Sequence, residues 1–113
     1  MLNLSLQQKY FDAIKAGLKI AEGRPHSPKF KDLHPGDMIS FTCMTTNEVI
    51  VCTVQAITLY QNFYEMLQAQ GVQNMLPGVA TIEDGVAVYE NFPLYKEKVL
   101  DGGAIAIEIK ICG

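Results

Sequence analysis

Gly17-Leu18-Lys19-Ile20-Ala21-Glu22-Gly23-Arg24 is the stretch that says most about this chain. The apolar side chains of residues 7–17 recur every three to four positions, which predicts an amphipathic helix that ends at the first glycine of the stretch. Residues 18–24 then predict a strand. In a regular strand Lys19 and Glu22 would face opposite sides, so their convergence needs a bulge or an irregular backbone, which the glycines of the stretch permit.

Short strands and helices alternate along the rest of the chain. The strict alternation of isoleucine with other residues over 104–111 is the clearest strand pattern. This arrangement predicts an α+β fold, and a mixed β-barrel with short flanking helices is the simplest solution because closure leaves few exposed sheet edges. The other predicted elements are strands over residues 2–6, 38–44 and 49–57, helices over 63–71 (capped by Asn62) and from 82 to about 89 or 92 (capped by Thr81), and a proline-rich loop over 25–36 with one helical turn near Phe30.

Length and composition predict one ordinary globular domain. A chain of 113 residues can close a core without disulfides or metal. Charged and polar residues interrupt each apolar run before it is long enough to cross a membrane. Residues 1–6 lack the basic and apolar regions of a signal peptide, so we expect a cytoplasmic protein. Three widely spaced cysteines without a CxxC pair predict buried, small apolar side chains in strands: Cys43, Cys52 and Cys112.

The charge distribution favours a pocket over a long nucleic-acid surface. The formal net charge of −3 argues against a protein that coats nucleic acid nonspecifically. Residues 19–34 nevertheless concentrate basic side chains and both histidines, with two acids among them. Neither histidine has a cysteine or carboxylate at ligand spacing, and no dinucleotide-binding, P-loop or protease motif is present, so we expect no metal and no cofactor. The basic segment contains Lys19, Arg24, Lys29, Lys31, His26 and His34.

Residues 17–24 resemble the G-x-K-x-x-E-x-R signature of the ASCH family, following an amphipathic helix. Residues 35–41 resemble the family's GD-x-I-x-F motif at the start of a strand, and residues 63–77 resemble its helix ending in a Leu-Pro break. Residues 85–107 resemble the closing helix and strand. The resemblance covers nearly the whole chain and implies one PUA-like β-barrel domain over residues 1–113, with a cleft lined by the Lys-Glu-Arg segment. Relatives with the PUA fold bind RNA.

Some small ASCH proteins resemble amidohydrolases that remove the acetyl group from N4-acetylcytidine. In those enzymes a lysine of the signature, a threonine three residues later and a downstream glutamate carry the chemistry. Here Lys19 occupies the lysine position, but Glu22 stands at the threonine position. No glutamate occurs in Met75-Leu76-Pro77-Gly78-Val79, and Glu83 and Asp84, a few residues later, are the candidates to replace it.

The candidate residues have definable chemistry. Lys19 is suited to hold a phosphate, polarise a carbonyl, or act as a base if burial lowers its pKa. Glu22 is suited to accept a hydrogen bond from the exocyclic amine of a base or to orient a water as general base. Arg24 is suited to bidentate recognition of phosphate or carboxylate, and a structural ion pair with Glu22 is the alternative role for both.

Two further residues complete the predicted ligand-binding set. Lys29 lies on the proline-rich loop, where it either contacts a nucleic-acid backbone or is simply solvated. Tyr95 lies two residues after Pro93, where we expect it to be exposed at the cleft and suited to stack on a base. Tyr89 is also suited to stack on a base but is more typical of a core residue. Lys31 has the same two alternatives as Lys29, and the sequence leaves the roles of Lys31, His26 and Tyr89 open.

Three functional hypotheses follow. The first is a module that binds RNA or a modified nucleoside through Lys19, Glu22 and Arg24, with aromatic stacking. The second is an enzyme with Lys19 and Glu22 as catalytic residues, an amidohydrolase acting on an acylated cytidine or, less favoured, a ribonuclease. The third is a regulatory interaction domain with a vestigial cleft. The partner expected is thus RNA or a small nucleoside, with no membrane, and the sequence leaves the oligomeric state open.

Overall fold

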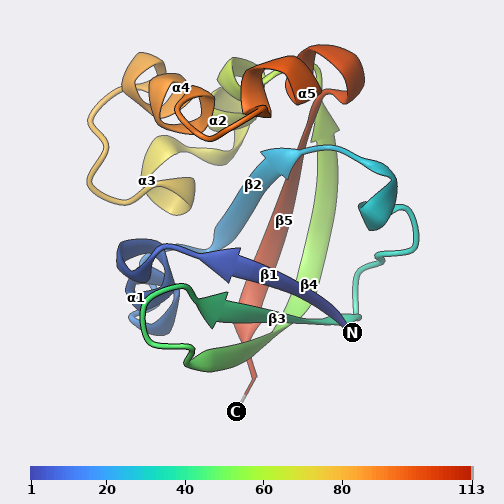
Figure 1. The fold of residues 1–113 in the computed structure, drawn as a ribbon, viewed down its shortest axis with the longest axis vertical. Coiled ribbons are helices and arrows are strands. Elements are labelled where there is room, and N and C mark those ends of the chain that lie inside the picture. Colours follow the sequence, from blue (N-terminus) through green and yellow to red (C-terminus); the bar gives the residue numbers. More distant parts are fainter. Residues whose placement is uncertain (113) are drawn as a thin grey trace.

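A computed structural model describes residues 1–112, which form a curved mixed sheet with helices around it (Figure 1). The strand order is β1-β3-β4-β5-β2. β1 runs parallel to β3, and the other neighbouring strands pair antiparallel. The α+β class is therefore confirmed. The sheet forms a half-barrel rather than a fully closed barrel, because its edge strands β1 and β2 do not pair. The strands are β1 (Leu2–Leu6), β2 (Ala21–Pro25), β3 (Met38–Cys43), β4 (Val49–Tyr60) and β5 (Ala104–Ile111).

Most helices gather at one end of the sheet, where β4 finishes and β5 begins, whereas α1 lies beside the end of β1 (Figure 1). The predicted caps are confirmed, since the Asn62 side chain accepts a hydrogen bond from the Glu65 amide and the Thr81 side chain accepts one from the Asp84 amide. The helices are α1 (Gln8–Lys15), the 3-10 turn η1 (Pro28–Phe30), α2 (Phe63–Gln70), α3 (Val72–Met75), α4 (Ile82–Glu90) and α5 (Tyr95–Gly102).

Helix α5 was not predicted from the sequence. Its N-cap residue is Leu94, which has a positive φ of 68° and provides no side-chain cap. A leucine in the left-handed conformation is rare, so no sequence pattern marks this start. Tyr95 is the first residue of α5 and is half-buried.

The strand β5 connects two hydrophobic clusters. Its isoleucines Ile105 and Ile107 pack into a cluster with Phe11 and Phe41. Its alanines Ala104 and Ala106 belong to the second cluster. Each large apolar side chain that is fully buried stabilises the fold by roughly 1.5–3 kcal/mol. The second cluster also holds Tyr10, Ala21, Phe63, Met66, Leu67, Met75, Leu76, Tyr89 and Val99, and it backs the site described below.

The cysteine prediction holds for two of three positions. Cys43 and Cys52 are fully buried in β3 and β4. The prediction is wrong for Cys112, which follows the end of β5, is half-buried, and has its Sγ 3.3 Å from the Thr53 hydroxyl. Among residues 1–112 no helix combines the length and the apolar character that crossing a membrane requires.

The two edges of the sheet, β1 and β2, approach each other without pairing as strands. The Arg24 guanidinium on β2 donates a hydrogen bond from Nη2 to the carbonyl oxygen of Ser5 on β1, at 2.7 Å. We call this junction the seam. It places the side chains of β2 opposite the end of β1.

Candidate functional site

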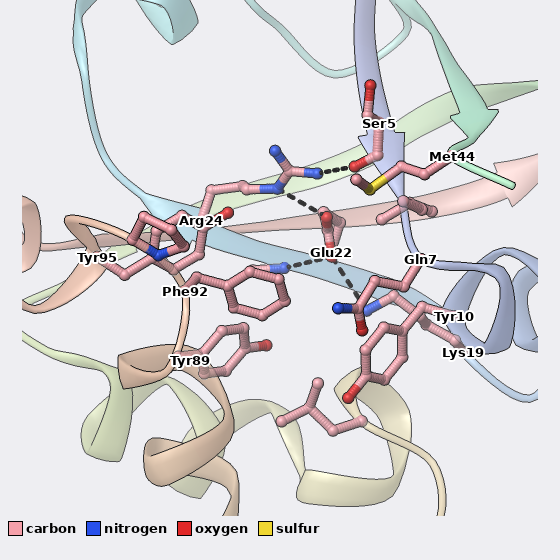
Figure 2. A pocket seen from close by; sticks show the side chains of 14 residues that line it. Ser5, Gln7, Tyr10, Lys19, Glu22, Arg24, Met44, Tyr89, Phe92 and Tyr95 are labelled. Atoms are coloured by element: carbon pink, nitrogen blue, oxygen red, sulfur yellow. Dashed lines mark hydrogen bonds and ion pairs between the residues drawn. The ribbon is translucent and has the colours of Figure 1, made fainter.

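A pocket of about 380 Å³ opens at the seam (Figure 2). Residues from β1, α1, β2 and the α4–α5 region surround it, so segments far apart in the sequence meet here. Its walls are largely apolar and aromatic, and its charged groups are Lys19, which precedes β2, and Glu22 and Arg24 on β2. The residues around it are Ser5, Leu6, Gln7, Tyr10, Lys19, Glu22, Gly23, Arg24, Met44, Leu76, Tyr89, Phe92, Pro93 and Tyr95.

The structure brings Lys19, Glu22 and Arg24 together without a β-bulge. The prediction of a strand from residue 18 is wrong at its start, because β2 begins at Ala21. Before the strand, the Lys19 amide donates to the Ala13 carbonyl and the Ile20 amide donates to the Asn74 carbonyl. Lys19 thus lies outside the strand's alternation of faces, and its side chain reaches the side on which Glu22 lies.

The Glu22 carboxylate lies between two cations. Its Oε1 is 3.1 Å from the Lys19 ammonium and accepts a hydrogen bond from the Gly23 amide. Its Oε2 accepts one from Arg24 Nε at 2.8 Å. Lys19 and Glu22 are 2% and 4% exposed, so this ion network is buried. A carboxylate has about four acceptor sites, and one therefore remains at Glu22.

The shared carboxylate sets the protonation states. Burial alone would raise the pKa of Glu22, but the positive charges of Lys19 and Arg24 outweigh burial and the pKa is lowered. Burial lowers the pKa of Lys19 more than the charge and hydrogen bond of Glu22 raise it, and the positive charge of Arg24 adds to the lowering. Glu22 is consequently an ionised acceptor at neutral pH and a weak base.

Lys19 has no hydrogen-bonding capacity left for a ligand. Its ammonium donates to the carbonyl oxygens of Ala21 and Met75, and its ion pair with Glu22 matches the third N–H group. The Met75 carbonyl belongs to a residue far along the chain. Lys19 therefore acts on the pocket through the charge and position of Glu22.

The Tyr89 hydroxyl is a buried polar group without a hydrogen-bond partner among residues 1–112. Its ring stacks on Phe63 at 4.6 Å, and Tyr89 is 3% exposed. Burial, followed by the negative charge of Glu22, raises the pKa of Tyr89 well above the usual tyrosine value, so the hydroxyl stays neutral and able to donate. Figure 2 shows it pointing toward the centre of the pocket.

Gly23 makes room for this hydroxyl. A Cβ atom at position 23 would lie 2.6 Å from the Tyr89 hydroxyl and 2.6 Å from the terminal methyl of Met66. Both distances are shorter than any ordinary van der Waals contact. The absence of a side chain at Gly23 therefore shapes the pocket floor.

Aromatic rings form the remaining walls. Phe92 and Tyr95 stack at 4.9 Å between centroids, and both border the pocket. Tyr10 and Phe92 were not singled out from the sequence. Tyr10 is one of the regularly spaced apolar residues of α1. This spacing cannot distinguish a ring that faces the core from one that faces a pocket.

Other candidates lie elsewhere. Lys29, on η1, borders an adjoining hollow rather than this pocket. The prediction that Glu83 or Asp84 replaces a downstream catalytic glutamate is wrong, because both are exposed on α4 and neither borders the pocket. Within residues 1–112 no group of three or more histidine, cysteine or carboxylate side chains is arranged to hold a metal ion.

A model of the ASCH domain matches residues 4–111. This chain belongs to the ASCH family. The match includes the end of β1, all of β2 and β5, and every residue that borders the pocket. The family assignment made from residues 17–24 is thus confirmed, while membership of the N4-acetylcytidine amidohydrolase group stays a prediction. No curated protein sequence matches this ASCH chain.

Two of the similar solved structures are of about the same length as this ASCH chain, and a third is longer. It is similar to the crystal structure of hypothetical protein PH0355, with a TM-score of 0.88 and 39% identity over 98% of each chain. It is also similar to the solution structure of protein PF0455 from Pyrococcus furiosus, with a TM-score of 0.77 and 38% identity over 97% of this chain and 96% of that one. ASCH from Zymomonas mobilis shares the fold, with a TM-score of 0.65 and 16% identity over 96% of this chain and 65% of that one. The PUA-like mixed fold is therefore confirmed.

Proposed function

We propose that the pocket binds a nucleoside, either free and modified or within RNA, and that this ASCH domain is a recognition module. One observation carries the proposal: the polar groups left unsatisfied in the pocket match the edge of a nucleobase. Glu22 retains an acceptor site, which suits an exocyclic amine. Tyr89 offers a neutral hydroxyl without a partner in residues 1–112.

The apolar part of the pocket suits the faces of a base. Tyr10, Phe92 and Tyr95 provide rings at its walls, and stacking on an aromatic ring is worth about 1–3 kcal/mol per base. The volume of about 380 Å³ lies in the range of small-molecule sites. Arg24 uses Nε for Glu22 and Nη2 for Ser5, which leaves its other N–H groups for polar atoms of a ligand.

Binding is favoured over hydrolysis by the state of the two predicted catalytic residues. The Lys19 N–H groups are all engaged within the protein, and the lowered pKa makes Glu22 a poor base. No second carboxylate borders the pocket within residues 1–112. The amidohydrolase hypothesis keeps one supporting observation, the lowered pKa of Lys19 beside a carboxylate.

The test compares binding with turnover. We expect N4-acetylcytidine, cytidine or a short cytidine-containing RNA to bind in isothermal titration calorimetry, and Arg24→Ala to weaken binding at least tenfold while chromatography detects no deacetylated product. Product that forms with the unchanged protein and disappears in Lys19→Met would show an amidohydrolase instead. The absence of binding by any nucleoside or RNA would refute the proposal.

Tyr89→Phe is expected to weaken ligand binding and leave the fold intact or more stable. The substitution removes a buried hydroxyl that has no partner, which relieves a desolvation penalty of about 1–3 kcal/mol. The same hydroxyl is the group offered to the ligand, so affinity should fall about tenfold. Thermal unfolding and calorimetric titration measure the two effects.

Tyr60→Phe is the matched control. The Tyr60 hydroxyl accepts a hydrogen bond from Gln70 at 2.9 Å and does not border the pocket. This variant should lose about 1 kcal/mol of stability and keep its affinity. Equal ligand affinity in Tyr89→Phe and the unchanged protein would show that the Tyr89 hydroxyl does not contact the ligand.

A further inference from the structure

A second hollow adjoins the pocket on the far side of Arg24 and Tyr95. Its volume is about 180 Å³, and Arg24 and Tyr95 border both cavities. The other residues around it are Pro25, Ser27, Lys29 and Lys98. A ligand that fills the pocket therefore has a continuation available along its wall.

The second hollow is cationic and lacks a carboxylate partner. Lys29 and Lys98 have no ion pair within residues 1–112, and the Arg24 charge is matched only by Glu22, which also serves Lys19. No acidic side chain borders this hollow. Burial lowers the pKa of Lys29, and the positive charges of Arg24 and Lys98 add to this shift. In a chain with a formal net charge of −3, this concentration of unmatched positive charge stands out.

The two backbone segments that carry Lys29 and Lys98 pack closely against each other. Lys29 lies on η1 next to Phe30, which is buried in the first hydrophobic cluster. Two residues before η1, the His26 amide donates a hydrogen bond at 2.9 Å to the carbonyl of Gly103, which directly follows α5. A Cβ atom on Gly102 would lie 2.8 Å from the His26 carbonyl oxygen, so the end of α5 packs closely against this loop. The loop that carries Lys29 and the helix that carries Lys98 are thereby fixed relative to each other.

The chemistry of this hollow suits a phosphate. Two ammonium groups and a guanidinium donate charge-assisted hydrogen bonds to phosphate oxygens, and the Ser27 hydroxyl adds a neutral donor. The hollow is less than half the volume of the pocket and has no aromatic wall apart from Tyr95, so it suits a compact anion rather than a second base.

We propose that the hollow formed by Lys29, Lys98, Ser27 and Arg24 binds the phosphate of the nucleoside that occupies the main pocket. The ligand class is then a nucleotide, either free or as a residue of RNA. This inference rests on the proposed nucleoside function of the main pocket, and Arg24 and Tyr95 contact the sugar region between the two sites.

The experiment measures the affinity gained from the phosphate. Calorimetry compares cytidine and N4-acetylcytidine with cytidine 3′-monophosphate, cytidine 5′-monophosphate and a three-nucleotide cytidine RNA at low salt. We expect at least one phosphorylated ligand to bind ten or more times tighter than cytidine. The double variant Lys29→Ala/Lys98→Ala should remove this gain and change nucleoside affinity by less than twofold. The 3′, 5′ and RNA arms identify where the phosphate comes from.

Lys96→Ala is the matched control, because Lys96 is an exposed lysine on the same helix that does not border the hollow. It should keep the gain, and the thermal unfolding midpoint of every variant should match that of the unchanged protein, since the side chains are exposed. Nucleosides that bind as well as their phosphates would overturn the phosphate site and leave the main pocket intact. If the phosphate still increases affinity in the double variant, the phosphate does not bind in the hollow of Lys29 and Lys98. If neither nucleosides nor nucleotides bind, both proposals are wrong.

Discussion

Glu22→Gln is expected to lower the free energy of unfolding by about 3–5 kcal/mol, because it removes one partner from a buried ion network. The glutamine keeps the size of the side chain, so the effect reports charge rather than packing. Lys19, 2% exposed, then retains a buried ammonium with carbonyl partners alone. Ligand affinity should also fall, since the acceptor in the pocket loses its charge.

The control is Glu48→Gln, which breaks the ion pair of Lys15 and Glu48. Their side chains are 2.7 Å apart but 46% and 49% exposed. Exposed pairs contribute about 0–1 kcal/mol, so this variant should unfold almost like the unchanged protein in urea titrations. Similar losses in both variants would show that the buried network contributes no more than a surface pair.

The Glu22 network also gives stability a dependence on pH. The pKa of Glu22 in the folded protein lies below the ordinary value of 4.5 that applies when the chain is unfolded. As the pH falls below 4.5, the unfolded chain takes up a proton first, so stability decreases until the pH passes the folded pKa. Urea unfolding between pH 6 and pH 3 should show a shallower decrease for Glu22→Gln than for the unchanged protein.

Gly23→Ala is expected to reduce both ligand affinity and stability, although it adds only one methyl group. The new methyl group would overlap the Tyr89 hydroxyl, the Met66 methyl and, at 3.0 Å, the Met75 methyl. The methionine side chains are flexible, but the tyrosine ring is rigid and stacked on Phe63. Overpacking of this kind lowers stability by about 1–3 kcal/mol. Displacement of the Tyr89 hydroxyl should reduce affinity at least tenfold.

Gly85→Ala separates strain from binding. Its Cβ would lie 2.7 Å from a Leu67 methyl between α4 and α2, so it crowds the same hydrophobic cluster without bordering the pocket. The helical alanine gains up to about 1 kcal/mol in propensity, which offsets part of the crowding. Affinity should stay unchanged. Equal affinity losses in the two variants would mean that Gly23 acts through general packing.

The sequence predicted that Lys19, Glu22 and Arg24 lie together, because they are close in the chain and match a family pattern. It did not predict which hydrogen bonds and ion pairs each side chain makes. The saturation of the Lys19 ammonium depends on the Met75 carbonyl, a contact between residues 56 positions apart that only the fold creates. Gly23 seemed to offer backbone freedom for a bulge, whereas the structure uses its missing side chain as space for Tyr89.

The aromatic wall was the least predictable part. The positions of Phe92 and Tyr95 are set by where α5 starts. That start lies at Leu94, whose left-handed backbone cannot be predicted from residue patterns. Alternating apolar residues, by contrast, specified the strands well, because one buried face of a strand dictates its register. Periodicity therefore predicted the sheet, and long-range contacts decided the site.

The seam has a consequence for how a ligand enters. Rows of backbone hydrogen bonds hold β1 to β3 and β2 to β5, but within residues 1–112 the hydrogen bond that spans the two edges comes from one side chain, Arg24 to Ser5. A hydrogen bond of this charged kind is worth about 1.5–3 kcal/mol. Separating β1 from β2 at the pocket entrance therefore breaks one hydrogen bond and unfolds no strand. The width of the entrance can thus adjust to the size of the ligand.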